Sequence, residues 1–252
     1  MLLEGRNAVI YGGGRIGGAV ARGFIDEGAR VFLAGRNQEK LERLADELRF
    51  AGGKADVAIV DALDEVQVEA HADKVVAEAG SLDISFNLIT HGDVQGTPMV
   101  DMEVEDYLAP VVNGVRTLFI TAKAAALHMK KQRSGVILIF GGAGDPMRGY
   151  NLGGLQTGFE AMESMRRQLA SELGPDGIRV VTLRSGGVPE SFPEGFEGRE
   201  KIIEDMEKAT MLGRAASFED VGNVAAFVAS DKARTMTAST VNVSCGTLID
   251  HQ

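Results

Sequence analysis

The stretch AVIYGGGRIGGAVARGF (residues 8–24) decides the fold of this chain. Its first four residues form a short apolar run, which is typical of a buried strand in a parallel sheet. Three consecutive glycines end the run, and apolar residues then recur from Ile16 at helical spacing. Gly12, Gly14 and Gly17 have the G-x-G-x-x-G spacing, which serves a tight turn, a close approach of the backbone to pyrophosphate, and close packing of helix on strand. A strand, a glycine turn and a helix in this order predict a phosphate-binding loop, with the amides near Ile16 facing the anion.

Apolar runs and amphipathic segments alternate along the rest of the chain. Strands are predicted at 8–11, 30–34, 55–60, 84–89, 135–140, 178–184 and 240–243. Helices are predicted at 38–51, 64–80, 151–173, 199–211 and 218–229, with a long helix that Pro110 should start or kink. This alternation predicts a parallel sheet covered on both faces, hence a single doubly wound (Rossmann) α/β domain over residues 1–252. The polar loop and helix near 185–211 are predicted to form a lid.

The composition limits the environment and the partners. A chain of 252 residues, 44% of them hydrophobic, can bury a large core in one domain. The net charge of −10 argues against nucleic acid or an anionic membrane as a partner. One cysteine, Cys245, excludes a disulfide framework and suits a reducing compartment. No signal peptide, membrane span or metal site is predicted, so we expect a cytoplasmic protein.

Four further blocks carry a resemblance to a known family. They are GRNQEKLERLADEL (35–48), ALHMKK (126–131), LASELGPDGIRV (169–180) and LGRAASFEDVGNVAAFVASD (212–231). Over essentially its whole length the chain resembles the short-chain dehydrogenase/reductase family. The resemblance implies a nicotinamide dinucleotide cofactor, oxidoreductase chemistry on a small molecule, and a homodimer or homotetramer.

The predicted cofactor site departs from the family pattern in two places. Tyr11 replaces the usual Thr before the glycines, and the loop is one residue shorter than Thr-Gly-x-x-x-Gly-x-Gly. The family's Asn-Asn-Ala-Gly becomes Asn87-Leu88-Ile89-Thr90. The resemblance still assigns Asn87 and Ile89 to a wall of the cofactor pocket and Asp61 to a contact with the adenine.

Arg36 directly follows the second predicted strand, where an NAD-binding enzyme places a carboxylate for the ribose 2′-hydroxyl. Neither Ala34 nor Gly35 supplies an acid, so Arg36 and Arg15 are predicted to hold a 2′-phosphate. This favours NADP(H) over NAD(H). The alternative is a pair of solvated arginines.

The larger departure concerns the catalytic residues. The family's reductases carry a Ser after the fifth strand, a Tyr-x-x-x-Lys on the next helix and an Asn in the long helix. Asn113 matches the Asn, whereas ungapped alignment places Gly142, Leu155 and Phe159 at the Ser, Tyr and Lys positions. The apolar stripe on this helix, which includes Leu155, Phe159 and Met162, is interpreted as core or subunit packing rather than as a substrate pocket.

A second register uses the local similarity to the enoyl-acyl-carrier reductases, whose motif is Tyr-x-x-x-x-x-x-Lys. It places Tyr150 at the Tyr position and Thr157 at the Lys position. In either register the lysine is missing, because none occurs between Lys131 and Lys201. Tyr150 is therefore the candidate proton donor, and packing at the pocket rim is the alternative.

His91 and Asp93 follow the fourth predicted strand, at the edge of the sheet where ligands bind. A solvated loop is favoured there over an acid/base pair. The sequence thus predicts an NADP(H)-binding oxidoreductase with an altered active site that reduces a carbonyl or an activated C=C bond. Two alternatives stay open. One is a cofactor-binding protein without turnover, and the other is a non-redox isomerase or lyase that uses His91 or Tyr150.

Overall fold

Seven parallel strands form one sheet in the computed structural model, which describes residues 1–142, 150–195 and 198–249. The strand order is β3-β2-β1-β4-β5-β6-β7, so the chain runs outward from β1 to β3, returns, and runs outward again from β4 to β7. The strands are β1 (Asn7–Tyr11), β2 (Arg30–Gly35), β3 (Lys54–Ile59), β4 (Ile84–Asn87), β5 (Gly135–Gly141), β6 (Ile178–Ser185) and β7 (Ser239–Val243). The predicted doubly wound sheet is confirmed. Its topology reverses between β1 and β4, the place where such sheets bind ligands.

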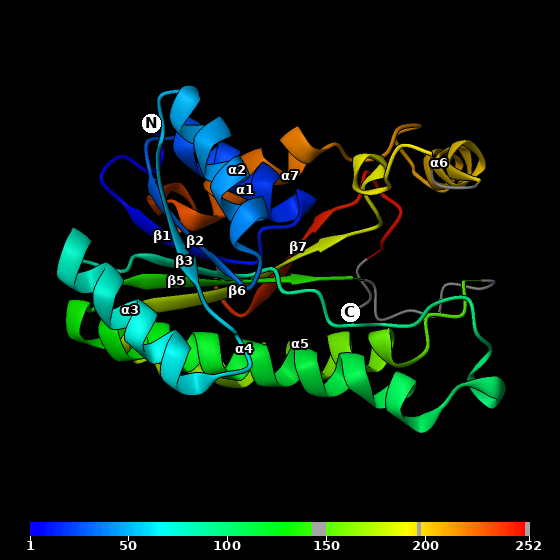
Figure 1. Ribbon diagram of the computed structural model, residues 1–252, viewed down its shortest axis with the longest axis horizontal. Helices are drawn as coiled ribbons and strands as arrows, with labels where there is room; N and C mark the ends of the chain where they lie inside the picture. The colour runs from blue at the N-terminus through cyan, green and yellow to red at the C-terminus, as the bar shows by residue number, and fades with distance from the viewer. Residues whose placement is uncertain (143–149, 196–197, 250–252) are drawn as a thin grey trace.

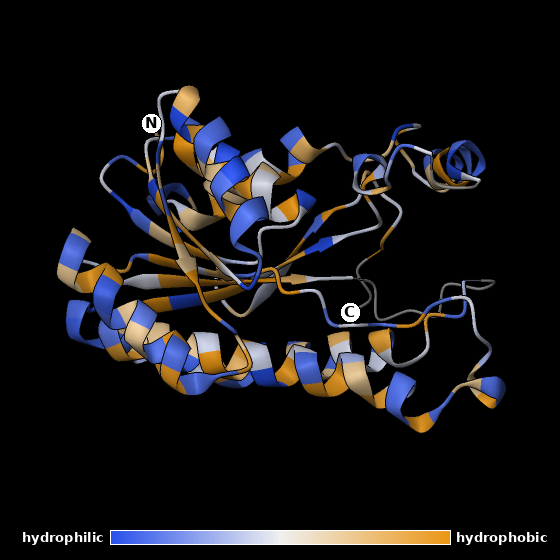
Figure 2. Cartoon of the chain, viewed as in Figure 1, coloured by the Kyte–Doolittle hydropathy of each residue, from blue (hydrophilic) through white to orange (hydrophobic). Residues whose placement is uncertain are grey.

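Helices cover both faces of the sheet. Figure 1 shows α1, α2 and α7 on one face and α3, α4 and α5 on the other, with α6 beyond the carboxyl ends of the strands. Their bounds are α1 (Arg15–Asp26), α2 (Gln38–Phe50), α3 (Glu65–Ala79), α4 (Val104–Gln132), α5 (Gly154–Leu173), α6 (Arg199–Lys208) and α7 (Phe218–Ala229). Every residue of β1 is buried, as a strand covered on both faces requires. Figure 2 shows the same division, with apolar strands between helices of mixed polarity.

Three predicted helix boundaries need correction. α4 begins at Val104, so Pro110 lies inside the helix rather than at its start. α5 begins three residues later than predicted because Asn151 and Gly153 have φ values of 47° and 54°, which an α-helix cannot contain. α6 ends before Met211, whose amide donates to the carbonyl of Cys245. Among the described residues, no helix has both the length and the apolar character needed to cross a membrane.

A buried histidine of α3 faces β1. His71 is 6% exposed, and its ring meets the Tyr11 ring edge-on at a centroid distance of 6.0 Å. Burial, assisted by the charge of Lys74, lowers the pKa of His71 to about 4. Burial likewise raises the pKa of the Tyr11 phenol. Both side chains are therefore neutral inside the folded protein near pH 7.

The free energy of unfolding should fall as the solution is acidified from pH 7 to pH 5. The pKa of His71 is about 4 in the folded protein and about 6.5 in the unfolded chain. Between these two pH values the unfolded chain binds more protons than the folded protein, so acidification stabilises the unfolded state. The expected loss is about 2 kcal/mol at pH 5. Urea titrations at several pH values measure it, and His71→Leu should remove most of this slope. His128→Gln, which removes a half-buried histidine of α4 that lies 3.0 Å from Asp73, is the matched control and should keep the slope.

Candidate functional site

In the turn between β1 and α1, Gly12 and Gly17 leave no room for a side chain. Gly12 has a φ of +116°, and a Cβ there would lie 2.4 Å from the carbonyl oxygen of Leu88. A Cβ on Gly17 would lie 2.0 Å from the carbonyl oxygen of Gly12. In contrast, a Cβ on Gly14 would meet nothing within 4 Å, and Gly14 precedes the first residue of α1. The first and third glycines thus pack the turn, whereas the second leaves space for an approaching ligand.

A cleft of about 390 Å³ opens beside this turn, at the reversal of topology between β1 and β4. Seven of its lining residues matter for the predicted site, namely Gly12, Gly14, Arg36, Lys40, Asp61, Ile89 and Asn113. All except Lys40 are predicted site residues, so the fold brings together side chains from the ends of β1, β2, β3 and β4 and from α4. The cleft therefore collects six of the predicted site residues, whereas Arg15, Ile16, Gly17 and Asn87 do not line it.

Arg36 and Lys40 form the basic side of the cleft. Among the described residues, no carboxylate pairs with either side chain. The Asn37 side chain accepts a hydrogen bond of 2.9 Å from the amide of Lys40, which starts α2 and holds Lys40 one turn after Arg36. Sequence reasoning missed Lys40, although a second basic residue in the first turn of the helix predicted from residue 38 was the available signal.

Asp61 lies at the end of β3 and has a fixed orientation. One of its carboxylate oxygens accepts a 3.0 Å hydrogen bond from the amide of Leu63, and its own amide donates to Gln67. Ile89 lines the cleft, whereas Asn87, which was predicted beside it, does not. Asn87 is 4% exposed, and its side chain accepts a 3.0 Å hydrogen bond from the Ile89 amide and donates to Thr121. Asn87 therefore shapes the loop rather than lining the cleft.

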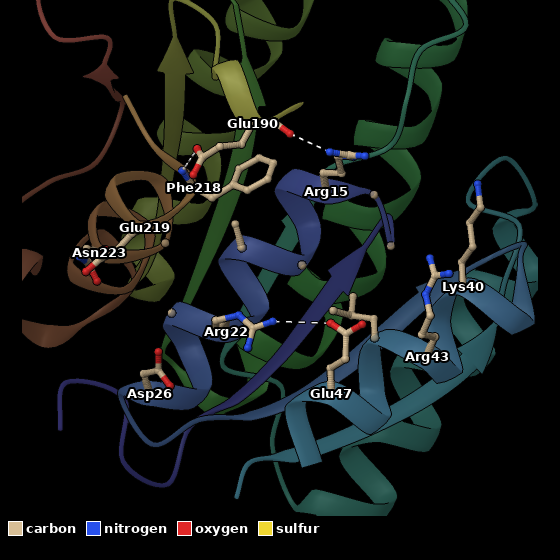
Figure 3. Close-up of a pocket in the computed structure, with 17 residues that line it drawn as sticks. Arg15, Arg22, Asp26, Lys40, Arg43, Glu47, Glu190, Phe218, Glu219 and Asn223 are labelled. Atoms are coloured by element: carbon tan, nitrogen blue, oxygen red, sulfur yellow. Dashed lines mark hydrogen bonds and ion pairs between the residues drawn. The ribbon is translucent and has the colours of Figure 1, made fainter. Parts of the chain in front are cut away.

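Arg15 is not in this cleft but in a neighbouring one of about 830 Å³ between α1, α2 and α7, shown in Figure 3. One of its guanidinium nitrogens donates a 3.0 Å hydrogen bond to the backbone carbonyl of Glu190, in the predicted lid segment. Ile16 packs against the core and Gly17 is buried, and neither residue lines the cleft of the predicted pocket. Lys40 lines both clefts and connects them.

His91 is buried, so the expectation of a solvated loop at this residue is wrong. It is 7% exposed, and its ring meets the Phe159 ring at a centroid distance of 5.7 Å. Burial lowers the pKa of His91, although the charge of Asp93 partly opposes the shift. Asn113 donates a 3.0 Å hydrogen bond from its side chain to the His91 carbonyl and so holds this loop on α4.

Gly142 and Phe159 lie at the family's Ser and Lys positions. The Phe159 ring fills the space that a side chain at position 142 would need. A Cβ on Gly142 would lie 2.5 Å from the Phe159 ring, so a serine fits only if the ring moves. The stripe prediction is correct for Met162, which is buried. Arg166, one turn further along α5, is also buried, and it pairs with Glu163 at 2.9 Å.

Tyr150 is 40% exposed, and the loop that precedes it (143–149) lies outside the described residues. Its backbone carbonyl accepts a hydrogen bond from the amide of Gly96. Thr157, the alternative Lys position, is hydrogen-bonded through its hydroxyl to the Tyr107 hydroxyl at 2.9 Å. The structure therefore brings Asn113, His91 and Phe159 together but does not join Tyr150 to them.

Comparison with known proteins gives the family. A family model described as enoyl-(acyl carrier protein) reductase matches residues 14–247. A 3alpha-hydroxysteroid dehydrogenase of Mediterraneibacter gnavus is 31% identical, over 96% of this chain and 97% of that protein. A 3-oxoacyl-(acyl-carrier-protein) reductase of Thermotoga maritima is 28% identical, over 99% of this chain and 100% of that protein.

Solved structures agree with these relatives. A short-chain type dehydrogenase/reductase from Mycobacterium ulcerans superposes with a TM-score of 0.89 at 26% identity, covering 98% of this chain and 91% of that one. One from Mycobacterium marinum gives a TM-score of 0.85, also at 26% identity, over 97% and 96% of the two chains. The chain belongs to the short-chain dehydrogenase/reductase family.

Proposed function

We propose that this oxidoreductase binds NADP(H) and uses an altered active site to reduce a carbonyl or an activated C=C bond of a small molecule. The observation that carries the cofactor assignment is the cleft under the glycine turn, whose basic side is formed by Arg36 and Lys40. Parallel sheets that bind NAD(H) place an acid at the end of β2, and Ala34 and Gly35 offer none.

The residues present fit a dinucleotide. The open space around Gly14 allows the backbone to approach a pyrophosphate, and the free amides at the start of α1 complement its charge. Arg36 and Lys40 would hold the 2′-phosphate, Asp61 the adenine side, and Ile89 and Asn113 the wall nearest β4. When bound, the nicotinamide supplies hydride for the reduction. The chain must then hold the substrate and supply a proton.

The altered active site rests on Gly142, Leu155 and Phe159. The close contact of Phe159 with Gly142 makes these two replacements mutually dependent, because restoring the serine alone would require the ring to move. The space of the usual serine and lysine is apolar, and His91 and Asn113 border it. Tyr150 remains to be tested as the proton donor, and His91 as an acid/base group in its place.

A second candidate function is cofactor binding without turnover, as a sensor or as the silent partner of an active paralogue. The Phe159 ring over Gly142 favours it, because it replaces the groups that position a proton donor. A homodimer or homotetramer also stays a prediction. The exposed apolar residues Leu108, Val112 and Phe119 on one face of α4 support it.

NADPH should bind about tenfold or more tightly than NADH, because a charge-assisted contact with a phosphate contributes about 1.5–3 kcal/mol. Arg36→Ala should remove most of this preference and leave NADH affinity unchanged. Titration of cofactor fluorescence measures both affinities. Arg22→Ala is the matched control, since Arg22 pairs with Glu47 and lies outside the cleft. Equal affinities for the two cofactors in the native chain would contradict the assignment.

Simple ketones should be reduced slowly or not at all, because loss of a positioned general acid costs about 10²–10⁴ in rate. NADPH oxidation is followed over a panel of ketones and activated alkenes. The triple variant Gly142→Ser, Leu155→Tyr and Phe159→Lys should increase ketone turnover. Vigorous ketone reduction by the native chain would show that the assignment of these positions is wrong.

Tyr150→Phe should lower kcat about 10²-fold or more if its hydroxyl donates the proton, with NADPH affinity unchanged. The substrate is whichever compound of the panel is reduced fastest. Tyr107→Phe is the control, because it removes a hydroxyl that is hydrogen-bonded to the Thr157 hydroxyl. Full activity in Tyr150→Phe together with a large loss in His91→Ala would instead assign the proton to His91.

A further inference from the structure

Arg184 lies beside the altered active site. It is the penultimate residue of β6 and is paired in register with Gly141, the last residue of β5. Gly142, at the position of the family's serine, follows directly. Alternate residues of β6, such as Val180, pack in the core under α3, α4 and α5, so Arg184 projects toward the same face. This is the face on which Phe159 contacts Gly142.

Glu163 connects Arg184 to α5, one turn after Phe159. The Glu163 side chain is 7% exposed, and one carboxylate oxygen accepts hydrogen bonds from Arg166 Nε at 3.0 Å and Thr240 Oγ1 at 3.1 Å. Nη2 of Arg184 is 4.0 Å from the same oxygen. Arg166 therefore forms the stronger ion pair with Glu163, and Arg184 interacts with the carboxylate only weakly.

The cluster carries one positive charge more than its own carboxylate neutralises. Burial acts to raise the pKa of Glu163, but the hydrogen bonds and the charge of Arg166 outweigh it and lower the pKa, so the carboxylate is ionised at neutral pH. Arg166 Nη1 and Arg184 Nε are buried and have no hydrogen-bond partner among the described residues. A buried guanidinium nitrogen without an acceptor is unfavourable, and an anion beside Arg184 would supply both an acceptor and the missing negative charge.

Arg184 is the member of the cluster that a ligand can reach. Its side chain is 20% exposed, whereas that of Arg166 is 6% exposed. It also lies at the carboxyl end of β6, on the edge of the sheet where ligands bind in this fold. The accessible group is thus a guanidinium, which matches the planar geometry of a carboxylate.

We propose that Arg184 is the anion-binding residue of the substrate site and that the substrate carries a carboxylate. The proposal rests on the proposed function, since it places the substrate at the altered active site. Glu163 is a positioning residue that holds Arg184 from α5 and limits its affinity for the anion. A neutral substrate would leave the guanidinium donors of Arg184 unpaired.

The test compares matched pairs of probes that differ only in charge, benzoate with benzamide and 4-oxopentanoate with 4-oxopentanamide. Calorimetric titrations use the full chain with and without saturating NADPH. The carboxylate of at least one pair should bind about tenfold or more tightly than its amide. Arg184→Met should abolish this preference, Arg184→Lys should keep part of it, and Arg167→Met, an exposed arginine on α5, should leave it unchanged.

Glu163→Gln separates a binding role from a purely structural one. Removing the competing carboxylate should raise the affinity for the carboxylate probe, opposite to the effect of Arg184→Met. If the cluster were only structural, both variants would lose affinity.

The proposal is overturned if neither carboxylate is preferred by the native chain, if the preference survives in Arg184→Met, or if Glu163→Gln also loses it. Should Arg184→Met fail to fold, Arg184→Lys and Glu163→Gln decide. Failure of NADPH to bind would refute the cofactor assignment alone, because the titration without NADPH still tests Arg184.

Discussion

The close approach of α1 to the end of β1 constrains the whole site. The Gly17 Cα lies so near the carbonyl of Gly12 that any side chain there would overlap it, and Gly12 in turn lies against the Leu88 carbonyl after β4. These contacts hold the ends of β1 and β4 and the start of α1 in one arrangement. The cleft exists because Gly14, between them, is left open. The shape of this cleft is therefore set first by contacts between backbone atoms and only then by side chains.

The second half of the site is organised by apolar packing rather than by a polar network. Phe159 lies against Gly142 and His91, and this contact buries an imidazole that the loop sequence alone would leave in water. Burial lowers the pKa of His91, so the ring is neutral near pH 7 and can accept a proton. The neutral imidazole of His91 beside the Phe159 ring differs chemically from the family's usual arrangement, in which a tyrosine phenol lies beside a lysine. The glycine turn is thus organised by close backbone packing, and the neighbourhood of Gly142 by the contact of Phe159 with His91.

Charge is distributed unevenly around these two halves. The chain is acidic overall, yet no carboxylate of the described residues pairs with Arg36 or Lys40 at the cleft, and Arg184 only approaches Glu163, at 4.0 Å. Other arginines have a carboxylate partner, for example Arg22 with Glu47 and Arg30 with Asp56. The net negative charge of the chain repels anions in general. Arg36, Lys40 and Arg184, at the edge of the sheet where ligands bind in this fold, favour an anionic ligand locally. Arg15 adds a link to the predicted lid through the Glu190 carbonyl.

The sequence by itself determined the elements and their order, because strand and helix periodicities and glycine spacing are local properties. It predicted the doubly wound sheet, the glycine turn, and the basic residue Arg36 after β2. It also showed without any alignment that no lysine is available between Lys131 and Lys201. Only the tertiary structure decided the burial of His91, the contact of Phe159 with Gly142, and the meeting of Arg184 with Glu163. Each of these joins segments from different strands and helices, and side-chain burial and charge pairing across such segments arise from packing that no local pattern records.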